Sequence, residues 1–80
     1  TPGAKNAEEK SGDDLKKYLR LHHTGYWGDL DPEDKLQNEI AIRIHDRRIF
    51  SVYHLSDGTK IWIITEVDFS VTTLLLPNEY

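Results

Sequence analysis

Three segments rich in β-branched and aromatic residues occupy the second half of the chain: residues 48–55, 60–67 and 71–76. The connections between them are too short to hold a helix. Residues 56–59 (Ser-Asp-Gly-Thr) have the composition of a tight hairpin turn, and residues 68–70 (Asp-Phe-Ser) predict a second turn. Strands joined in this way pair with their neighbours in sequence and run antiparallel. The spacing therefore predicts a three-stranded antiparallel meander that ends at Pro77, which cannot donate to a strand ladder.

The first half of the chain predicts helices. One helix face is indicated by four residues at the spacing i, i+3, i+4 and i+7: Leu15, Tyr18, Leu19 and His22. Ser11 or Asp13 can cap the start of this helix, and Gly25 can end it. We therefore expect an amphipathic helix from about Asp13 to the glycine.

A second helix is predicted after a short connection. Asp31 can act as its N-cap, and Pro32 fits the first helical position. The buried stripe of this helix would consist of three residues: Leu36, Ile40 and Ala41. We expect the helix to run to about Arg43. Ile42 and Ile44 break the helical period, so a short strand is an alternative for that stretch.

Together these elements predict an α+β fold in which two N-terminal helices pack on one face of a three-stranded antiparallel meander sheet. Eighty residues suffice for one small domain, which we place at residues 13–80. Residues 1–12 contain no bulky apolar side chain. Because such a stretch gains too little from burial to offset its ordering entropy, we expect a flexible tail there.

The chain contains no cysteine, which excludes disulfides, a thiolate nucleophile and cysteine-ligated zinc. It has no apolar run of the roughly 18–20 residues that span a bilayer, and residues 1–5 do not resemble a signal peptide. We therefore expect a cytoplasmic protein with no membrane contact. Methionine is absent even from position 1, so we expect that Thr1 is not the translation start.

Acidic side chains are concentrated in the middle of the chain. Residues 29–46 carry six acidic and two basic residues, a sum of −4, which equals the net charge of the whole chain. The acidic residues are Asp29, Asp31, Glu33, Asp34, Glu39 and Asp46. A nucleic-acid-binding protein presents a basic face, because neutralised phosphates supply much of its affinity. The sequence therefore disfavours nucleic acid as a partner. The acidic block could mimic a nucleic-acid surface, dock on a basic partner, or be only a solvated helix face.

No motif for catalysis or metal binding stands out. His22 and His23 are adjacent, so on a helix they point about 100° apart and cannot easily hold one metal ion. The glycines show no phosphate-loop spacing. We predict no metal site, no cofactor and no catalytic residue, and the sequence favours a non-enzymatic role.

Two weaker candidate sites remain. Glu66 and Asp68 bracket Val67 at the end of a strand and could form a small polar site with Thr65, although acids near a turn often bond the turn's own backbone. Of the two tryptophans, Trp62 sits inside an apolar strand. Trp27 lies between two glycines and is the better candidate for a functional aromatic residue. All candidate binding residues taken together are Trp27, Asp29, Asp31, Glu33, Asp34, Thr65, Glu66 and Asp68.

Four stretches carry a resemblance to a known family. They are His22-x-x-Gly25-x-Trp27-Gly28-Asp29, then Asp31-x-Glu33-Asp34 followed by Asn38, then Arg48-Ile49-x-Ser51-x-Tyr53, and most specifically Trp62 to Tyr80. The pattern resembles a family of short bacterial proteins described as plasmid-related or hypothetical, found on mobile elements and in chromosomes. The resemblance implies a bacterial, cytosolic protein whose natural terminus is near Tyr80, and it implies no activity. The chain departs from the family pattern at Phe69, where a basic residue is expected, and near His45-Asp46, where glycine is expected.

The small size, the acidic helix and the lack of catalytic motifs favour a protein-interaction module with an unidentified protein partner, acting in defence against mobile DNA or in its maintenance. Its main contacts would be Asp31, Glu33 and Asp34, with the Trp27 loop as a second contact. The alternative is a small-molecule-binding or enzymatic site that gathers Trp27, Asp29, Thr65, Glu66 and Asp68. Charges such as Arg48 and Lys60 discourage pairing between sheet edges, so we expect a monomer.

Overall fold

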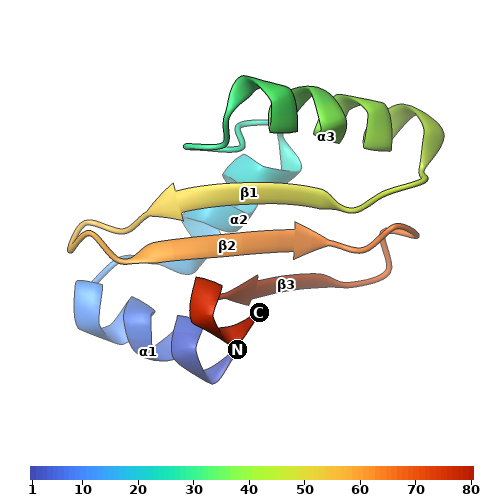
Figure 1. Cartoon of the computed structure of the whole chain (residues 1–80). Helices are drawn as coiled ribbons and strands as arrows, with labels where there is room; N and C mark the ends of the chain where they lie inside the picture. Colours follow the sequence, from blue (N-terminus) through green and yellow to red (C-terminus); the bar gives the residue numbers. More distant parts are fainter.

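The computed structural model describes residues 1–80 and contains three α-helices, one three-stranded sheet and a short 3-10 turn (Figure 1). In chain order the elements are α1 (Pro2–Ser11), α2 (Leu15–His23), α3 (Pro32–Ile44), β1 (Ile49–His54), β2 (Lys60–Thr65), β3 (Thr72–Leu75) and η1 (Pro77–Glu79). The α+β class predicted from the sequence is confirmed. None of the helices is both long and apolar enough to cross a bilayer.

The sheet is the predicted antiparallel meander, with strand order β1-β2-β3. Tyr53 of β1 lies opposite Ile61 of β2, and Ile63 of β2 lies opposite Leu74 of β3. Gly58 adopts a φ of 89° in the first turn, a conformation that glycine reaches without steric cost. The local turn chemistry therefore sets both the strand order and the register.

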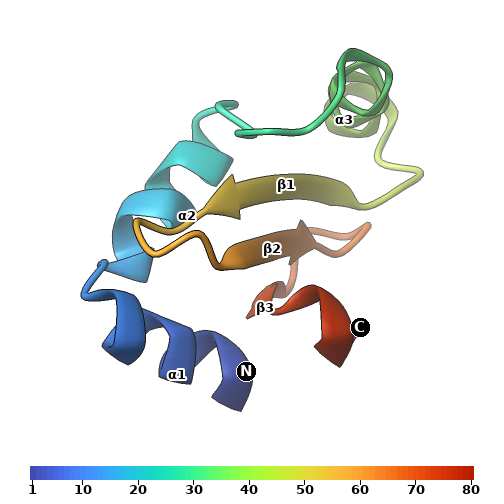
Figure 2. The same ribbon diagram turned by 60° about the vertical axis from the view of Figure 1, so that its left-hand side comes forward.

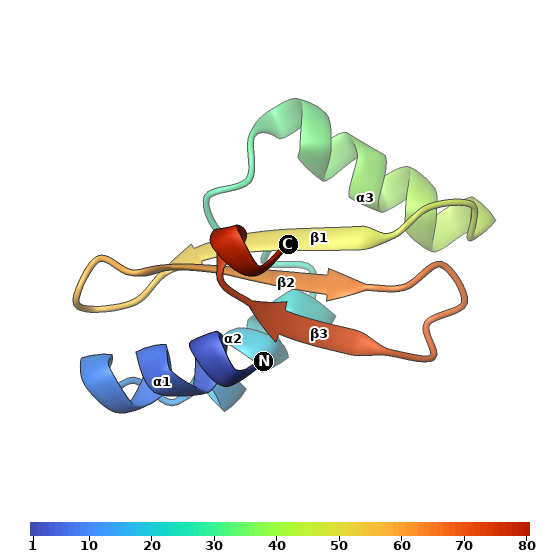
Figure 3. The same cartoon turned by 60° about the horizontal axis from the view of Figure 1, so that its bottom comes forward.

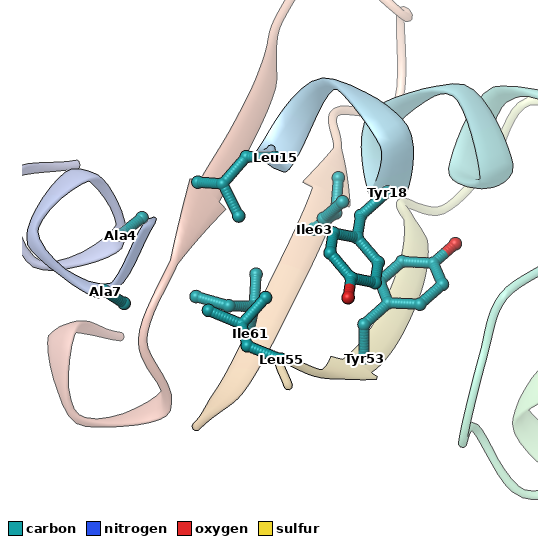
Figure 4. Packing of buried hydrophobic residues seen from close by; sticks show 8 residues of the cluster. All are labelled: Ala4, Ala7, Leu15, Tyr18, Tyr53, Leu55, Ile61 and Ile63. Carbon is teal, nitrogen blue, oxygen red and sulfur yellow. The ribbon is translucent and has the colours of Figure 1, made fainter. Parts of the chain in front are cut away.

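The inner face of the sheet carries the hydrophobic core. Because side chains alternate along a strand, Tyr53, Ile61 and Ile63 share this face and are buried. They pack against Leu15 and Tyr18 of α2 (Figure 4). In Figure 2, α2 lies on one side of the sheet and η1 lies on the other. The outer face consequently has no long helix over it.

Residues 1–12 are not the predicted flexible tail, because Pro2–Ser11 form helix α1 with Thr1 and Gly12 as its caps. Ala4 and Ala7 of α1 are buried in the same core cluster as the inner face of the sheet. Glu79 accepts hydrogen bonds from the Thr1 hydroxyl (2.6 Å) and from the Gly3 backbone nitrogen (3.0 Å). The prediction considered only bulky apolar residues. Helix α1 instead packs on the core through Ala4 and Ala7, and its start is held by the carboxylate of Glu79, which is far away in the sequence.

Helix α3 lies alongside β1, at the edge of the sheet (Figures 1 and 3). Only two of its residues, Asn38 and Ala41, are buried. The side-chain amide of Asn38 forms hydrogen bonds with both backbone groups of Phe50 in β1. These groups are available because β1 is an edge strand, whereas in an interior strand they would pair with a neighbouring strand. The predicted packing of the helices at 13–24 and 31–43 on one face is therefore not confirmed. The helix continues to Ile44, so the alternative of a short strand there is wrong.

Candidate functional site

A buried histidine links α2 to the inner face of the sheet. His22 stands in the last turn of α2 and is 4% exposed. Its Nδ1 atom forms a hydrogen bond with the hydroxyl of Ser51, and its Nε2 atom lies 2.8 Å from Oγ1 of Thr65. The Thr65 hydroxyl in turn lies 2.9 Å from that of Thr72. The result is a polar chain, Ser51–His22–Thr65–Thr72, that begins in the core and ends near the surface.

The environment keeps the imidazole of His22 neutral at neutral pH. Burial, and to a smaller extent the neighbouring His23, lowers its pKa from 6.5 to about 4. A neutral imidazole has one donor and one acceptor nitrogen. Since a hydroxyl can either donate or accept, Ser51 and Thr65 satisfy both nitrogens without an ion. No buried side-chain nitrogen or oxygen in the protein lacks a hydrogen-bond partner.

A pocket of about 390 Å³ opens beside this polar chain. We call it the His22 pocket; its lining includes His22, His23, Trp27, Ile49, Phe69 and Thr72. The lining is mixed: Trp27, Ile49 and Phe69 are apolar, and the hydroxyls of Thr65 and Thr72 are polar. The pocket is therefore suited to a small, uncharged ligand with one hydrogen-bonding group.

The Ser51–His22 pair does not have the arrangement of a nucleophile and its general base. Ser51 is fully buried (0% exposed), so a substrate cannot reach its hydroxyl. The second nitrogen of His22 contacts a threonine, where a catalytic triad places a carboxylate. The pair therefore serves the packing of α2 on the sheet.

The loop that contains Trp27 runs beside β1 and closes part of its edge. The Trp27 carbonyl accepts from the Val52 nitrogen (3.2 Å), and the Asp29 nitrogen donates to the Val52 carbonyl (2.7 Å). Gly28, between them, has a φ of 70°, and a Cβ atom there would lie 2.1 Å from the Val52 oxygen. Trp27 itself is only 7% exposed and lines the His22 pocket, so its indole faces inward.

The structure brings together two of the five residues of the predicted small-molecule site. Trp27 and Thr65 both line the His22 pocket. Asp29 instead forms a hydrogen bond on the surface with Nδ1 of His54 (2.6 Å). Glu66 lies 4.0 Å from Arg48. Asp68 accepts from the Ser70 nitrogen (3.0 Å), which is the turn-bonding alternative that the sequence offered.

The acidic residues Asp31, Glu33 and Asp34 do lie together, at the start of α3. Asp31 caps the helix by accepting from the Asp34 nitrogen (3.0 Å). Partial desolvation and the charges of Asp31 and Glu33 raise the pKa of Asp34 above its usual value. All three residues are exposed. The first turn of α3 is therefore a compact negative patch on the surface.

Large apolar side chains are exposed along the same helix. Leu36 is 53% exposed and Ile44 is 60% exposed. Ile40, between them at i+4 and i−4, is half-buried. We call these three residues the α3 stripe. The sequence predicted that Leu36 and Ile40 are buried in the core. For Leu36 this prediction is wrong, because the side of α3 that faces β1 carries Asn38 and Ala41.

Two non-glycine residues with positive φ meet beside the His22 pocket. His45 ends α3 with a φ of 53°, and Phe69 has a φ of 62° in the second turn. Their rings lie 4.7 Å apart between centroids. His45 occupies the left-handed position that often ends a helix and that glycine adopts most readily.

Sequence reasoning missed two groups of residues. Of the polar chain Ser51–His22–Thr65–Thr72, only Thr65 was a predicted site residue, and the signal for the chain was the presence of Ser51 and Thr65 at inward-facing strand positions. Phe50, Trp62 and Tyr80 form an aromatic cluster with Arg48 on the outer face. The alternation of Phe50 with Ser51 and of Trp62 with Ile63 could have indicated that cluster.

No protein-family model, curated protein or solved structure matches the chain. No group of three or more histidine, cysteine, aspartate or glutamate side chains is arranged to hold a metal ion.

Proposed function

We propose that the domain is a protein-interaction module that binds its partner through the exposed side of α3. The observation that carries the proposal is the α3 stripe directly beside an acidic helix start. A small domain needs its large apolar side chains for its own core. Here Leu36 and Ile44 remain more than half exposed. Apolar surface bordered by charged residues is typical of protein–protein contact sites.

The geometry of α3 gathers these residues on one side. Positions i, i+4 and i+8 of an α-helix follow one another along a gently drifting line, so Leu36, Ile40 and Ile44 form a continuous stripe. The residues that hold α3 in place, Asn38 and Ala41, face β1. The stripe can therefore be covered by a partner without displacing α3 from the sheet.

The charge pattern defines the chemistry of the partner. Asp31, Glu33 and Asp34 form a negative patch at the N-terminal end of the stripe, and no basic residue lies between them. The matching surface would be an apolar groove or helix with lysine or arginine at one end. Such complementary charges accelerate association and fix the orientation of the partner. From the sequence resemblance we further propose that this partner acts in defence against mobile DNA or in its maintenance.

Affinity capture from the native host tests the proposal with matched variants. One variant, Glu33→Lys with Asp34→Lys, reverses the patch and leaves the Asp31 cap in place. A second variant, Leu36→Ser with Ile44→Ser, removes the apolar part. The control, Glu9→Lys, reverses an exposed charge on α1. We expect one protein that is retained by wild type and by the control and is lost by both α3 variants. Retention by both α3 variants, or no specific capture by folded wild type, would contradict the proposal.

One observation favours a second function, the binding of a small molecule in the His22 pocket. Apolar side chains and two threonine hydroxyls line this pocket together, and this combination can orient an uncharged ligand. A titration with uncharged metabolites, followed by NMR, should then shift signals of His22, Thr72 and Phe69. A broad set of compounds that leaves all three unchanged would argue against this function.

A further inference from the structure

The outer face of the sheet holds a groove of about 380 Å³ that the proposed function does not use. It is lined by Arg48, Phe50, Trp62, Ile64 and Tyr80. Phe50 and Trp62 stand on the neighbouring strands β1 and β2. The 3-10 turn η1 lies on this side of the sheet, whereas α2 lies behind it (Figure 3). We call this feature the aromatic groove.

Three aromatic rings are arranged edge to face along the groove. The centroids of Phe50 and Trp62 lie 5.1 Å apart with an interplanar angle of 89°. Those of Trp62 and Tyr80 lie 5.7 Å apart at 65°. All three rings line the groove, so part of their surface is accessible from it. An open ring face can receive a flat apolar molecule by stacking.

One cation stands at the end of this aromatic row. The guanidinium of Arg48 lies 5.6 Å from the centre of the Tyr80 ring, and its Nη2 atom donates to the Tyr80 hydroxyl. Its Nη1 atom is 4.0 Å from the nearest Glu66 carboxylate oxygen, which is too long for a hydrogen bond. A guanidinium has five N–H donors in a planar fork. Most of them are therefore free to bind an anion.

From this arrangement we infer that the aromatic groove binds a flat aromatic carboxylate, with its ring against Trp62 and its carboxylate on the guanidinium of Arg48. The planar fork of arginine matches the two oxygens of a carboxylate, and a bidentate contact of this kind fixes orientation as well as charge. The volume of the groove lies at the small end of the range for ligand sites, which fits a molecule of one or two rings.

The same surface is poorly suited to single-stranded nucleic acid, the other ligand that stacks on aromatic residues of a sheet. Such proteins combine stacking residues with a positive groove that follows several phosphates. Only one cation lines the aromatic groove, Glu66 lies beside it, and the chain has a net charge of −4. A single anionic group is what this site can neutralise.

NMR titration with 2-naphthoate tests the inference, with uncharged 2-naphthamide as the matched ligand. The indole N–H of Trp62 should shift with naphthoate, whereas a shift of the Trp27 indole would report binding in the His22 pocket instead. Arg48→Gln should weaken naphthoate binding by roughly tenfold, the effect expected from losing a charge-assisted bidentate contact, and should change naphthamide binding little. Arg48→Lys should give intermediate binding, because it keeps the charge and loses the fork.

A second variant, Glu66→Gln, should change naphthoate affinity in the opposite direction. Removing the competing carboxylate should strengthen naphthoate binding several-fold and should leave naphthamide unchanged. The inference is overturned if Trp27 shifts as much as Trp62, if Arg48→Gln binds both ligands as wild type does, or if millimolar naphthoate causes no shift. It is also overturned if an oligothymidylate shifts the Trp62 signal at lower concentration than naphthoate.

Discussion

The side-chain amide of Asn38 pairs with the backbone of Phe50 as a neighbouring strand would. Its Oδ1 atom accepts from the Phe50 nitrogen (2.9 Å), and its Nδ2 atom donates to the Phe50 carbonyl (2.6 Å). Two residues further on, the Trp27 loop bonds both backbone groups of Val52. The free edge of β1 is thus closed by one side chain and one loop. An exposed edge is a template for pairing with other chains, and this closure removes it.

Substitution of Asn38 should therefore destabilise the whole domain. Asn38→Ala leaves two backbone groups of Phe50 without their partners in a partly buried place, so we expect a loss of about 2–3 kcal/mol in the free energy of unfolding. Asn38→Asp keeps the acceptor but places an oxygen against the Phe50 carbonyl, and it should be at least as harmful. Urea denaturation measures both. A loss below about 0.5 kcal/mol for Asn38→Ala would show that the pairing contributes little.

Gly28 and Gly25 form a matched pair for testing the close approach of the Trp27 loop to β1. Both have positive φ, 70° and 89°. A Cβ atom at Gly28 would lie 2.1 Å from the Val52 oxygen and 2.7 Å from the Tyr53 ring, whereas at Gly25 nothing lies within 4 Å. Gly25→Ala should cost only the backbone strain, about 1 kcal/mol. Gly28→Ala should cost at least about 2 kcal/mol more, because the loop must also move away from β1. Equal losses in thermal or urea unfolding would refute the close approach.

The buried His22 should make the domain less stable in mild acid. Its pKa is 6.5 when the chain is unfolded and about 4 in the fold, so between these values the unfolded chain binds a proton that the folded protein does not. Stability is full above pH 6.5, falls as the pH drops toward 4, and is not reduced further by this group below pH 4. A shift of about 2.5 pKa units corresponds to a loss of roughly 3 kcal/mol.

The matched variant for this prediction is His22→Gln, which is less stable at neutral pH but has no group to protonate. Urea denaturation at intervals from pH 7.5 to pH 4 should show a smaller decrease for His22→Gln than for wild type. Parallel curves for the two proteins would mean that His22 is not the source of the acid sensitivity.

The meander and the start of α3 could be predicted because their signals are local, whereas the cap of α2 is Asp14 and not the predicted Ser11 or Asp13. The turn at residues 56–59 lies between segments of β-forming residues, and Asp31 with Pro32 defines a helix start within one turn. The position of α3 could not be predicted in this way. It depends on Asn38 bonding to a strand edge twelve residues away, and the residue type alone does not reveal such a partner.

The candidate site also depends on contacts between residues that are far apart in the sequence, which local patterns do not reveal. The helical spacing placed His22 on the inner face of its helix, yet its partners Ser51 and Thr65 are 29 and 43 residues away. Trp27 and Thr65 converge because two separate elements border the same pocket. Glu66 and Asp68, although separated by one residue only, do not form a joint site, because Asp68 bonds within its own turn. The acidic residues of α3 were found together because one helical turn is sufficient to gather them.

The most direct test of the interaction surface is the dissociation constant of the captured partner for wild type, Glu33→Lys and Glu9→Lys, measured by calorimetry at low salt. The two variants change the net charge equally, and only Glu33 lies beside the α3 stripe. We predict at least about tenfold weaker binding for Glu33→Lys, which corresponds to about 1.4 kcal/mol, and binding within a factor of two of wild type for Glu9→Lys. Equal weakening by the two variants would mean that the partner responds to overall charge, and it would contradict α3 as the contact surface.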